Sequence, residues 1–383
     1  MSLSILFQQK KVGRLTIPNH FMRSATYEGL ADNDGRPSGK LISMIETLSK
    51  GGVGLIVPGA VYVTKSGQGY FGQSGLTTLE QARMWNLCIE NVHKNGSKFL
   101  FQIIHHGTRS DPRFNGGFMP SGPTAINKEQ HELTNAEIED IIQDFADSAE
   151  LAYRAKSDGV QIHAGHGYLL NEFLSPAINK RIDKWGGCDE NRVRIIKEIV
   201  KAIRERVPDD FSISIKMNGD DHIEGGMKPE LAAKYVNSMK NDFDFFEISA
   251  GGNYSILSQV NEKVLTKGVK NDNKKKELVN FAKMFTKGTQ FKEMYNLDAL
   301  KIIKKAVPDV NLALVGGNRK FSDMEKVVKE GLVDIISLSR PLLHDPFLVQ
   351  KFKEKKIDHS PCISCGACLL NSEKGIYCHL PRK

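Results

Sequence analysis

Two histidines and a tyrosine stand close together in one short segment, at His163, His166 and Tyr168. An apolar run precedes them, which puts them where a buried strand would end. Imidazoles that converge there can donate hydrogen bonds to a carbonyl or nitro oxygen of a substrate, and the phenol can act as a general acid. The segment therefore predicts substrate binding or catalysis. The alternatives are a metal-binding pair, which would need a third ligand nearby, and histidines that only pack.

Two other strand ends carry residues suited to a phosphate group. Gly316, Gly317 and Asn318 follow one apolar run, and Ser339 and Arg340 follow the next. Glycine amides can approach a phosphate closely, and a guanidinium binds it through paired hydrogen bonds. In barrels of alternating strands and helices, phosphate commonly binds between the loops after strands seven and eight. The two segments together therefore predict a phosphate site.

Lys216 lies within a third apolar run, at residues 212–217. A cation in such a position can stabilise negative charge that develops on a ligand. The alternative is an ion pair buried in the core. The apolar surroundings favour the functional role over the ion pair.

Eight short apolar runs have the pattern of buried parallel strands. They lie at residues 21–25, 54–58, 99–104, 160–163, 212–217, 245–249, 312–315 and 334–338. Stretches with helical periodicity alternate with them, at residues 41–49, 79–92, 135–156, 191–206, 230–239, 297–306 and 322–329. Thr134 before Glu137 and Ser322 before Glu325 are the expected caps of two of these helices.

The connections between these elements are asymmetric. Helix-to-strand joins are short, whereas strand-to-helix joins are long at residues 105–133, 164–190 and 250–296. This asymmetry is typical of a (β/α)8 TIM barrel, whose active site lies at the C-terminal ends of its strands. A doubly wound sheet is the alternative, but no Gly-x-Gly-x-x-Gly follows the first strand. We therefore predict an α/β barrel over residues 1–350 and a short C-terminal tail over residues 351–383.

Length and composition agree with one large barrel. The chain has 383 residues, 40% hydrophobic and 26% charged, which excludes disordered and fibrous classes. Its 53 Lys and Arg against 45 Asp and Glu give a net charge of +8, which favours anionic small ligands over nucleic acid. The apolar segment 53–63 is too short to cross a membrane, and residues 1–11 lack the apolar core of a signal peptide. We therefore expect a cytoplasmic protein.

The segment that begins at His163 continues with Phe-Leu-Ser-Pro at 173–176, Asn-Lys-Arg-Ile-Asp at 179–183 and Gly-Gly at 186–187. The whole run resembles the Old Yellow Enzyme family of FMN-dependent oxidoreductases, and other motifs extend the resemblance over about residues 5–350. The resemblance implies a barrel that takes hydride from NADH or NADPH and passes it through flavin N5 to an electrophilic acceptor, such as an α,β-unsaturated carbonyl. His163 and His166 would then hold the oxygen of the acceptor, and Tyr168 would donate a proton.

The same resemblance assigns twelve residues to the cofactor FMN. They are Ser24, Ala25, Thr26, Gly59, Ala60, Gln102, Lys216, Gly316, Gly317, Asn318, Ser339 and Arg340. The first three are expected to lie against the flavin, and the next two to let the backbone approach its ring. Gln102 and Lys216 are expected at its pyrimidine edge, and the last five around its phosphate.

Two other functional classes stay open on the residues alone. A non-redox TIM-barrel lyase or isomerase would use Gly316, Gly317 and Arg340 for the phosphate of its substrate. A zinc-tailed nucleic-acid-binding protein would use the cysteines and the basic excess. On the flavoenzyme hypothesis the partners are the acceptor and NADH or NADPH, with no nucleic acid and no membrane, and we expect a homo-oligomer.

Four of the six cysteines form a cluster near the end of the sequence, with the spacing Cys362-x2-Cys365-x2-Cys368-x9-Cys378. This spacing suits zinc or an iron–sulfur cluster. It also resembles the cluster segment of the dienoyl-CoA reductase and trimethylamine dehydrogenase group, although its later gaps are shorter. Those relatives continue into a second nucleotide-binding domain, whereas this sequence stops at Lys383. A tail without metal, an iron–sulfur cluster and zinc are therefore all open hypotheses.

Some segments differ from the better-known family members. Arg23, Ala25 and Tyr27 give the first strand a different lining, and His106 stands where many relatives have alanine. The 251–296 loop is expected to form one wall of the substrate pocket, through the aromatic residues Tyr254, Phe291 and Tyr295. Within it, the lysine-rich stretch 270–276 is expected to be a solvated loop.

Overall fold

The structure is a computed structural model that describes residues 3–251, 266, 270–286, 291–370 and 375–380. Among these residues, eight parallel strands pair side by side and close into a barrel. The strands are β3 (Phe21–Arg23), β4 (Leu55–Ile56), β6 (Lys98–Ile104), β9 (Gly159–Ala164), β10 (Ser212–Asp220), β11 (Phe246–Ala250), β12 (Leu312–Val315) and β13 (Ile335–Leu338). Each predicted apolar run corresponds to one of them. The predicted (β/α)8 TIM barrel is therefore confirmed.

The ring closes through the pairing of β4 with β6. The order around it is β4-β3-β13-β12-β11-β10-β9-β6, so strands adjacent in the sequence are mostly adjacent in space. A further short strand, β5 (Val61–Tyr62), pairs with the end of β6.

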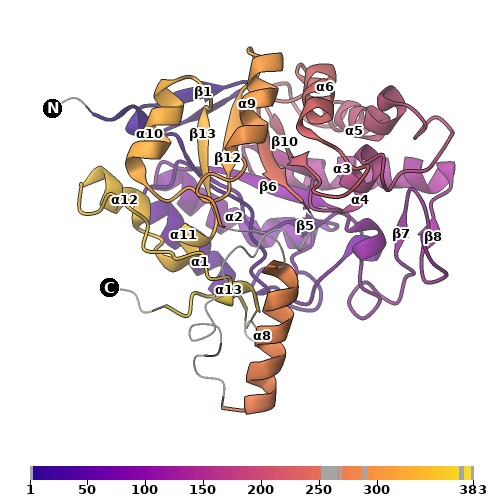
Figure 1. Cartoon of the computed structure of the whole chain (residues 1–383), viewed down its shortest axis with the longest axis horizontal. Helices are drawn as coiled ribbons and strands as arrows, with labels where there is room; N and C mark the ends of the chain where they lie inside the picture. Colours follow the sequence, from indigo (N-terminus) through magenta and orange to yellow (C-terminus); the bar gives the residue numbers. More distant parts are fainter. Residues whose placement is uncertain (1–2, 252–265, 267–269, 287–290, 371–374, 381–383) are drawn as a thin grey trace.

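Helices pack around the outside of the barrel, except α8, which projects away from it beside the C-terminal tail (Figure 1). The longer ones are α1 (Gly39–Lys50), α2 (Leu79–Lys94), α3 (Asn135–Arg154), α5 (Asp189–Arg204), α6 (Pro229–Met239), α8 (Asp272–Thr286), α9 (Leu297–Ala306) and α10 (Phe321–Lys329). Shorter elements lie in the connections: α4 (Leu169–Leu174), α11 (Arg340–His344), α12 (Leu348–Lys353), α13 (Ala367–Leu370), β7 (Ser121–Gly122), β8 (His131–Glu132), η1 (Ile5–Phe7), η2 (Lys65–Gly67) and η3 (Gly107–Arg109).

One end of the barrel is closed by an N-terminal hairpin. Strands β1 (Lys10–Val12) and β2 (Leu15–Ile17) are joined at Gly13, whose φ of +57° suits a glycine turn. Their buried apolar side chains pack with the inward-facing residues of the strands, Met22, Leu55, Val57, Leu100, Ala313 and Ile335. This apolar plug leaves the opposite end, at the C-terminal ends of the strands, for ligands.

The helix starts show one cap that was predicted correctly and one that was not. Thr134 and Glu137 form the predicted reciprocal capping box at the start of α3. Helix α10, by contrast, begins at Phe321 after Lys320, so Ser322 lies inside the first turn. Its hydroxyl contacts the neighbouring Asp323 instead of capping the helix.

The lysine-rich stretch 270–276 was predicted to be a loop. In the structure most of it belongs to helix α8. Lys275 pairs with Asp272 at 2.6 Å in the first turn, and the run that follows consists of good helix formers. Leu278 and Val279 pack against Cys365 and Ala367 of the C-terminal tail. The lysines at 270, 274 and 276 are exposed, which agrees with the predicted solvated face.

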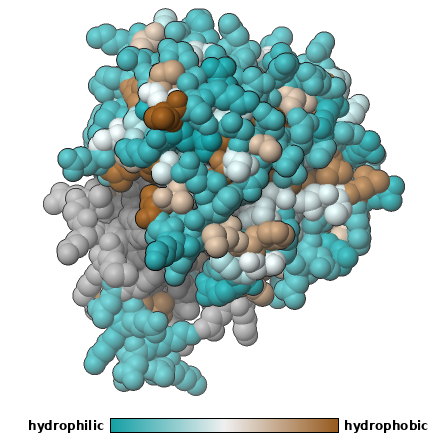
Figure 2. Space-filling model, turned by 90° about the vertical axis from the view of Figure 1, so that its right-hand side faces the viewer, coloured by the Kyte–Doolittle hydropathy of each residue, from teal (hydrophilic) through white to brown (hydrophobic). Residues whose placement is uncertain are grey.

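The surface carries mainly polar residues. On the face shown in Figure 2, hydrophilic residues predominate and the hydrophobic ones are scattered. Within the described ranges, no helix combines the length and the apolar character that crossing a membrane requires.

Candidate active site

A cavity of about 500 Å³ opens at the C-terminal ends of the barrel strands. Its size suits a small-molecule ligand. Fourteen of the fifteen predicted site residues line it: Ser24, Ala25, Thr26, Ala60, Gln102, His163, His166, Tyr168, Lys216, Gly316, Gly317, Asn318, Ser339 and Arg340. These residues come from all parts of the sequence, and the closed barrel brings them together.

Gly59 is the one predicted site residue that does not line the cavity. Its backbone N–H donates to both carboxylate oxygens of Glu28 at 2.9 Å. A Cβ at this position would lie 2.2 Å from that carboxylate. The need for glycine here therefore comes from the buried Glu28–Arg23 pair, and not from the cavity.

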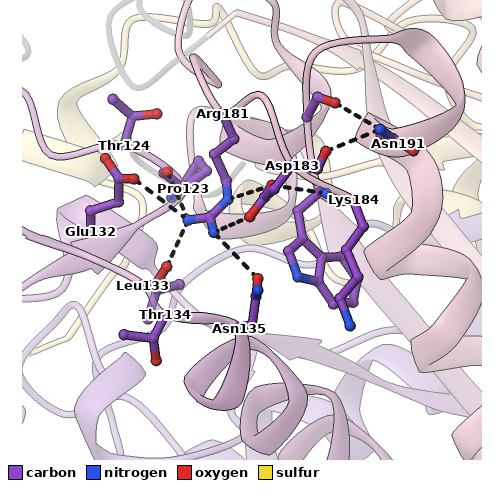
Figure 3. A network of polar contacts seen from close by, with 12 residues as sticks. Pro123, Thr124, Glu132, Leu133, Thr134, Asn135, Arg181, Asp183, Lys184 and Asn191 are labelled. Carbon is purple, nitrogen blue, oxygen red and sulfur yellow. Dashed lines mark hydrogen bonds and ion pairs between the residues drawn. The ribbon is translucent and has the colours of Figure 1, made fainter.

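Arg181 ties together two long loops that follow strands of the barrel (Figure 3). Its guanidinium donates to the carbonyl of Leu133 at 2.6 Å and to the carboxylate of Asp183. It thereby joins the loop after β6 to the loop after β9. Asn191 fixes the second loop by donating to the carbonyls of Asp183 and Gly186. This part of the long sequence motif thus joins two loops and does not line the cavity.

The two predicted histidines are neutral side chains with defined roles in hydrogen bonding. Burial lowers the pKa of His166 to about 3 and that of His163 well below its ordinary value. His163 Nδ1 accepts from the backbone N–H of Gly165, which leaves the proton on Nε2. His166 Nε2 lies 2.7 Å from the hydroxyl of Ser249, and the rings of the two histidines are 5.0 Å apart. The pair can therefore present N–H donors without a charge.

Tyr168 belongs to an aromatic cluster that the sequence did not reveal. Its hydroxyl lies 2.6 Å from that of Tyr70, and its ring is 4.6 Å from that of His106. Tyr27 packs on the other side of Tyr70, with ring centroids 5.1 Å apart. All four residues line the cavity. Tyr70 lies in a loop far from Tyr168 in the sequence, so no spacing pattern could have paired them.

Lys216 is both a cavity residue and a member of a buried ion pair. Its ammonium donates to Ser24 Oγ at 2.8 Å and lies 3.5 Å from Glu247 Oε1. The sequence analysis treated a functional cation and a buried ion pair as alternatives. The ion pair is present, and Lys216 also lies in the cavity lining. Glu247 was missed because it lies in an apolar strand with no motif around it.

The opposite end of the cavity has the features of an anion site. Gly316 and Gly317 have φ angles of +105° and +74°, where other residues are strained. Arg340 is buried, and its guanidinium donates to the carbonyl of Ser364 at 3.4 Å. Ser339 Oγ lies 2.5 Å from Thr26 Oγ1, next to the first strand.

Two polar groups at this end have unused hydrogen-bonding capacity. Asn318 donates to the carbonyls of Leu314 and Ser337, but its buried Oδ1 has no donor among the described residues. The buried Nε of Arg319, another cavity residue, likewise has no acceptor in the described part of the chain. Buried groups of this kind usually have a partner, so they favour a bound ligand that supplies one.

Two further predicted residues, Gln102 and Ala60, line the cavity. Gln102 is buried and donates to Gln161 Oε1 at 2.6 Å, which fixes its amide in the cavity wall. Ala60 is also in the lining, and its carbonyl accepts from Gln73 at 3.0 Å. Of the loop residues expected in this wall, Tyr295 lines the cavity, whereas Phe291 is placed beside Arg319. Tyr254 lies outside the described residues.

The cysteine tail lies beside the cavity. Ser364 and Ile376 of the tail line it. Burial raises the pKa of the Cys368 thiol to about 12 and also raises that of Cys362. Cys378 Sγ lies 3.2 Å from Nδ1 of the buried His344. Within the described ranges, no three or more His, Cys, Asp or Glu side chains are grouped as metal ligands.

Fold and site together define a TIM-barrel protein whose cavity is lined by two glycines of positive φ, a buried arginine, a buried lysine and a histidine pair. The family model described as NADH:flavin oxidoreductase / NADH oxidase matches residues 5–359. The chain therefore belongs to this family, as its resemblance to Old Yellow Enzyme indicated.

Similar proteins include an NADH oxidase of Thermoanaerobacter brockii, 30% identical over 94% of this chain and 52% of its own length. An NADH-dependent flavin oxidoreductase of Aspergillus parasiticus is also 30% identical, over 90% of this chain and 77% of its own. Among solved structures, a 2-naphthoyl-CoA reductase complex has a TM-score of 0.81 at 27% identity, covering 95% of this chain and 54% of that one. The chain thus spans about half the length of some curated relatives.

Proposed function

We propose that this chain is an FMN-dependent oxidoreductase that takes hydride from NADH or NADPH and delivers it to an electrophilic acceptor, such as an α,β-unsaturated carbonyl. The observation that carries the proposal is the single cavity that joins an anion site at one end to an uncharged pair of histidine donors at the other. Family membership supports the flavin and the reductant. It also disfavours the two alternatives, a phosphosugar lyase or isomerase and a nucleic-acid-binding protein.

The residues of the cavity fit FMN in their chemistry. Arg340 and the amides of Gly316 and Gly317 would bind its phosphate, and the unused Oδ1 of Asn318 can accept from a hydroxyl. Lys216 would lie at the pyrimidine edge, where its positive charge would stabilise negative charge that develops on the ligand. The roles of Ser24, Ala25, Thr26, Ala60, Gln102 and Ser339 as flavin contacts are part of the same proposal.

The chain's own residues would orient the acceptor and move its proton. When bound, FMN supplies the hydride chemistry that no side chain can perform. The neutral His163 and His166 would donate to the carbonyl oxygen of the acceptor and thereby polarise its double bond. Tyr168 would transfer its hydroxyl proton to the α-carbon.

Anaerobic half-reactions test this proposal directly. We expect protein loaded with FMN to be bleached by NADH or NADPH, and its colour to return when cyclohexenone is added. Protein that holds FMN but is bleached by neither nucleotide would contradict the reductant. Return of colour with oxygen but not with any enone or nitro compound would contradict the acceptor class.

The same sample tests two further expectations. Light scattering would give the mass of the expected homo-oligomer. Iron, sulfide and zinc analysis separates the three hypotheses for the tail at Cys362, Cys365, Cys368 and Cys378: no metal, an iron–sulfur cluster or zinc.

A further inference from the structure

A carboxylate lies buried in the barrel beside the cavity. Glu247 extends from β11 and is 0% exposed. Its Oε1 accepts from Ser24 Oγ and from Ser337 Oγ, both at 2.6 Å, and lies 3.5 Å from Lys216 Nζ. The three partners belong to β10, to β13 and to the end of β3. One carboxylate oxygen therefore contacts polar groups from three other strands of the barrel.

The hydrogen bonds in this cluster all run from donors toward the carboxylate of Glu247. Lys216 donates to Ser24 Oγ at 2.8 Å, because an ammonium has only donors. Ser24 in turn donates to Glu247, and so does Ser337. Glu247 accepts from every neighbour, as an ionised carboxylate does. It therefore supplies the counter-ion that a buried ammonium requires.

The second carboxylate oxygen is left unsatisfied. Glu247 Oε2 is buried and has no hydrogen-bond donor among the described residues. A carboxylate kept only for stability would be expected to have both oxygens paired, because an unpaired one is costly. Lys216, Ser24 and Ser337 all line the cavity. This arrangement favours a functional role, in which Glu247 acts on residues of the cavity, over a purely structural one.

We propose that Glu247 is a positioning residue that fixes Lys216 and offsets its charge, and that it thereby keeps the reduction potential of the bound flavin low. The inference rests on the proposed function. Lys216 alone would favour the reduced flavin, which carries the additional negative charge. A carboxylate close to the lysine weakens that effect, since it adds a negative potential at the same place. A flavin of lower potential is the better donor of hydride to an acceptor.

The test is the reduction potential of bound FMN in a Glu247→Gln variant, measured anaerobically against a reference dye. Removing a unit charge near the flavin should raise the equilibrium constant for its reduction about tenfold, which is ~30 mV for a two-electron couple. Asp244→Asn is the matched control. It replaces another buried carboxylate, which pairs with Arg14 of the N-terminal hairpin at 3.0 Å and not with Lys216, so it should not move the potential.

An unchanged potential in a Glu247→Gln variant that folds and holds FMN would overturn the inference. If that variant does not fold, Glu247→Asp replaces it, because a shorter side chain retracts the charge from Lys216. We then expect a smaller rise, about twofold in the equilibrium constant, and an unchanged value again overturns the inference. A parent protein that binds FMN and is reduced by NADH or NADPH, together with unshifted variants, would reject only the role of Glu247. A parent that binds no FMN would reject the proposed function itself.

Discussion

The protonation of the cavity residues is set by burial more than by their neighbours. His163, His166 and His106 lie in the lining, and desolvation is the largest cause of the lowered pKa of each. For His166 the pKa is about 3 and for His106 about 4. These imidazoles are therefore neutral at physiological pH. A neutral imidazole has one N–H, and His163 and His166 can offer theirs to a carbonyl acceptor. His106 donates its own, on Nδ1, to the carbonyl of Gly67 at 2.7 Å.

His166→Ala should weaken the binding of a phenol or enone ligand about tenfold, because it removes one hydrogen bond to the ligand. The flavin content should stay the same, since His166 contacts Ser249 and not the anion end. Spectral titration with a phenol gives the dissociation constant. His131→Ala is the control, because His131 pairs with Glu137 away from the cavity. Loss of flavin in the His166 variant would contradict its assigned role.

Arg340→Ala should lower the affinity for FMN by about 10- to 100-fold, which is the worth of a hydrogen bond to a charged group. Fluorescence of free FMN during titration of the apoprotein measures this. Arg113→Ala, which changes a surface arginine paired with Asp111, is the control and should bind FMN normally. Unchanged occupancy in the Arg340 variant would remove Arg340 from the phosphate site.

At the scale of elements, one buried carboxyl joins the loop after β6 to the helix after β9. Glu172 of α4 accepts from the backbone N–H of Thr108 in η3 at 3.1 Å and also contacts the Thr108 hydroxyl. Burial raises the pKa of Glu172 to about 8. At a pH between 4.5, the ordinary pKa of the group, and about 8, Glu172 keeps its proton in the folded chain but has lost it in the unfolded chain. The contribution of Glu172 to stability is therefore present below pH 4.5 and is lost as the pH rises toward 8.

Glu172→Gln should consequently gain stability relative to the parent as the pH rises. The difference in free energy of unfolding, variant minus parent, should grow by ~2–4 kcal/mol between pH 5 and pH 8. Urea denaturation at the two pH values measures it. Glu90→Gln is the control, since the exposed Glu90 has a pKa lowered by Lys156 and does not titrate in this window. A difference that is flat with pH would mean that Glu172 is already ionised at pH 5.

Patterns in the sequence were sufficient to predict most of the strands and helices, but not all of them. The eight strands are buried on both faces, so each appears as a continuous apolar run between short joins. Ser322 was expected to cap α10 because a serine three residues before a glutamate is a common signal, but Phe321 already takes a helical position. The stretch 270–276 looked like a loop because it is polar throughout, although α8 uses Leu278 and Val279 to contact the tail.

At the scale of the whole molecule, the site depends on contacts between distant parts of the chain. His163, Lys216 and Arg340 could be found because each lies at or near the end of an apolar run. Glu247 and Tyr70 could not, because their roles arise only when the barrel closes. Helix α12 runs across residue 350, and tail residues line the cavity, so the division into residues 1–350 and 351–383 stays a prediction.

The central claim is that the cavity is a flavin site, and equilibrium binding of FMN tests it most directly. Purified protein, stripped of any ligand, should bind FMN in a one-to-one ratio and become yellow. The Arg340→Ala variant should bind it less tightly under the same conditions. A chain that is folded by circular dichroism but takes up no FMN at micromolar concentration would contradict the account.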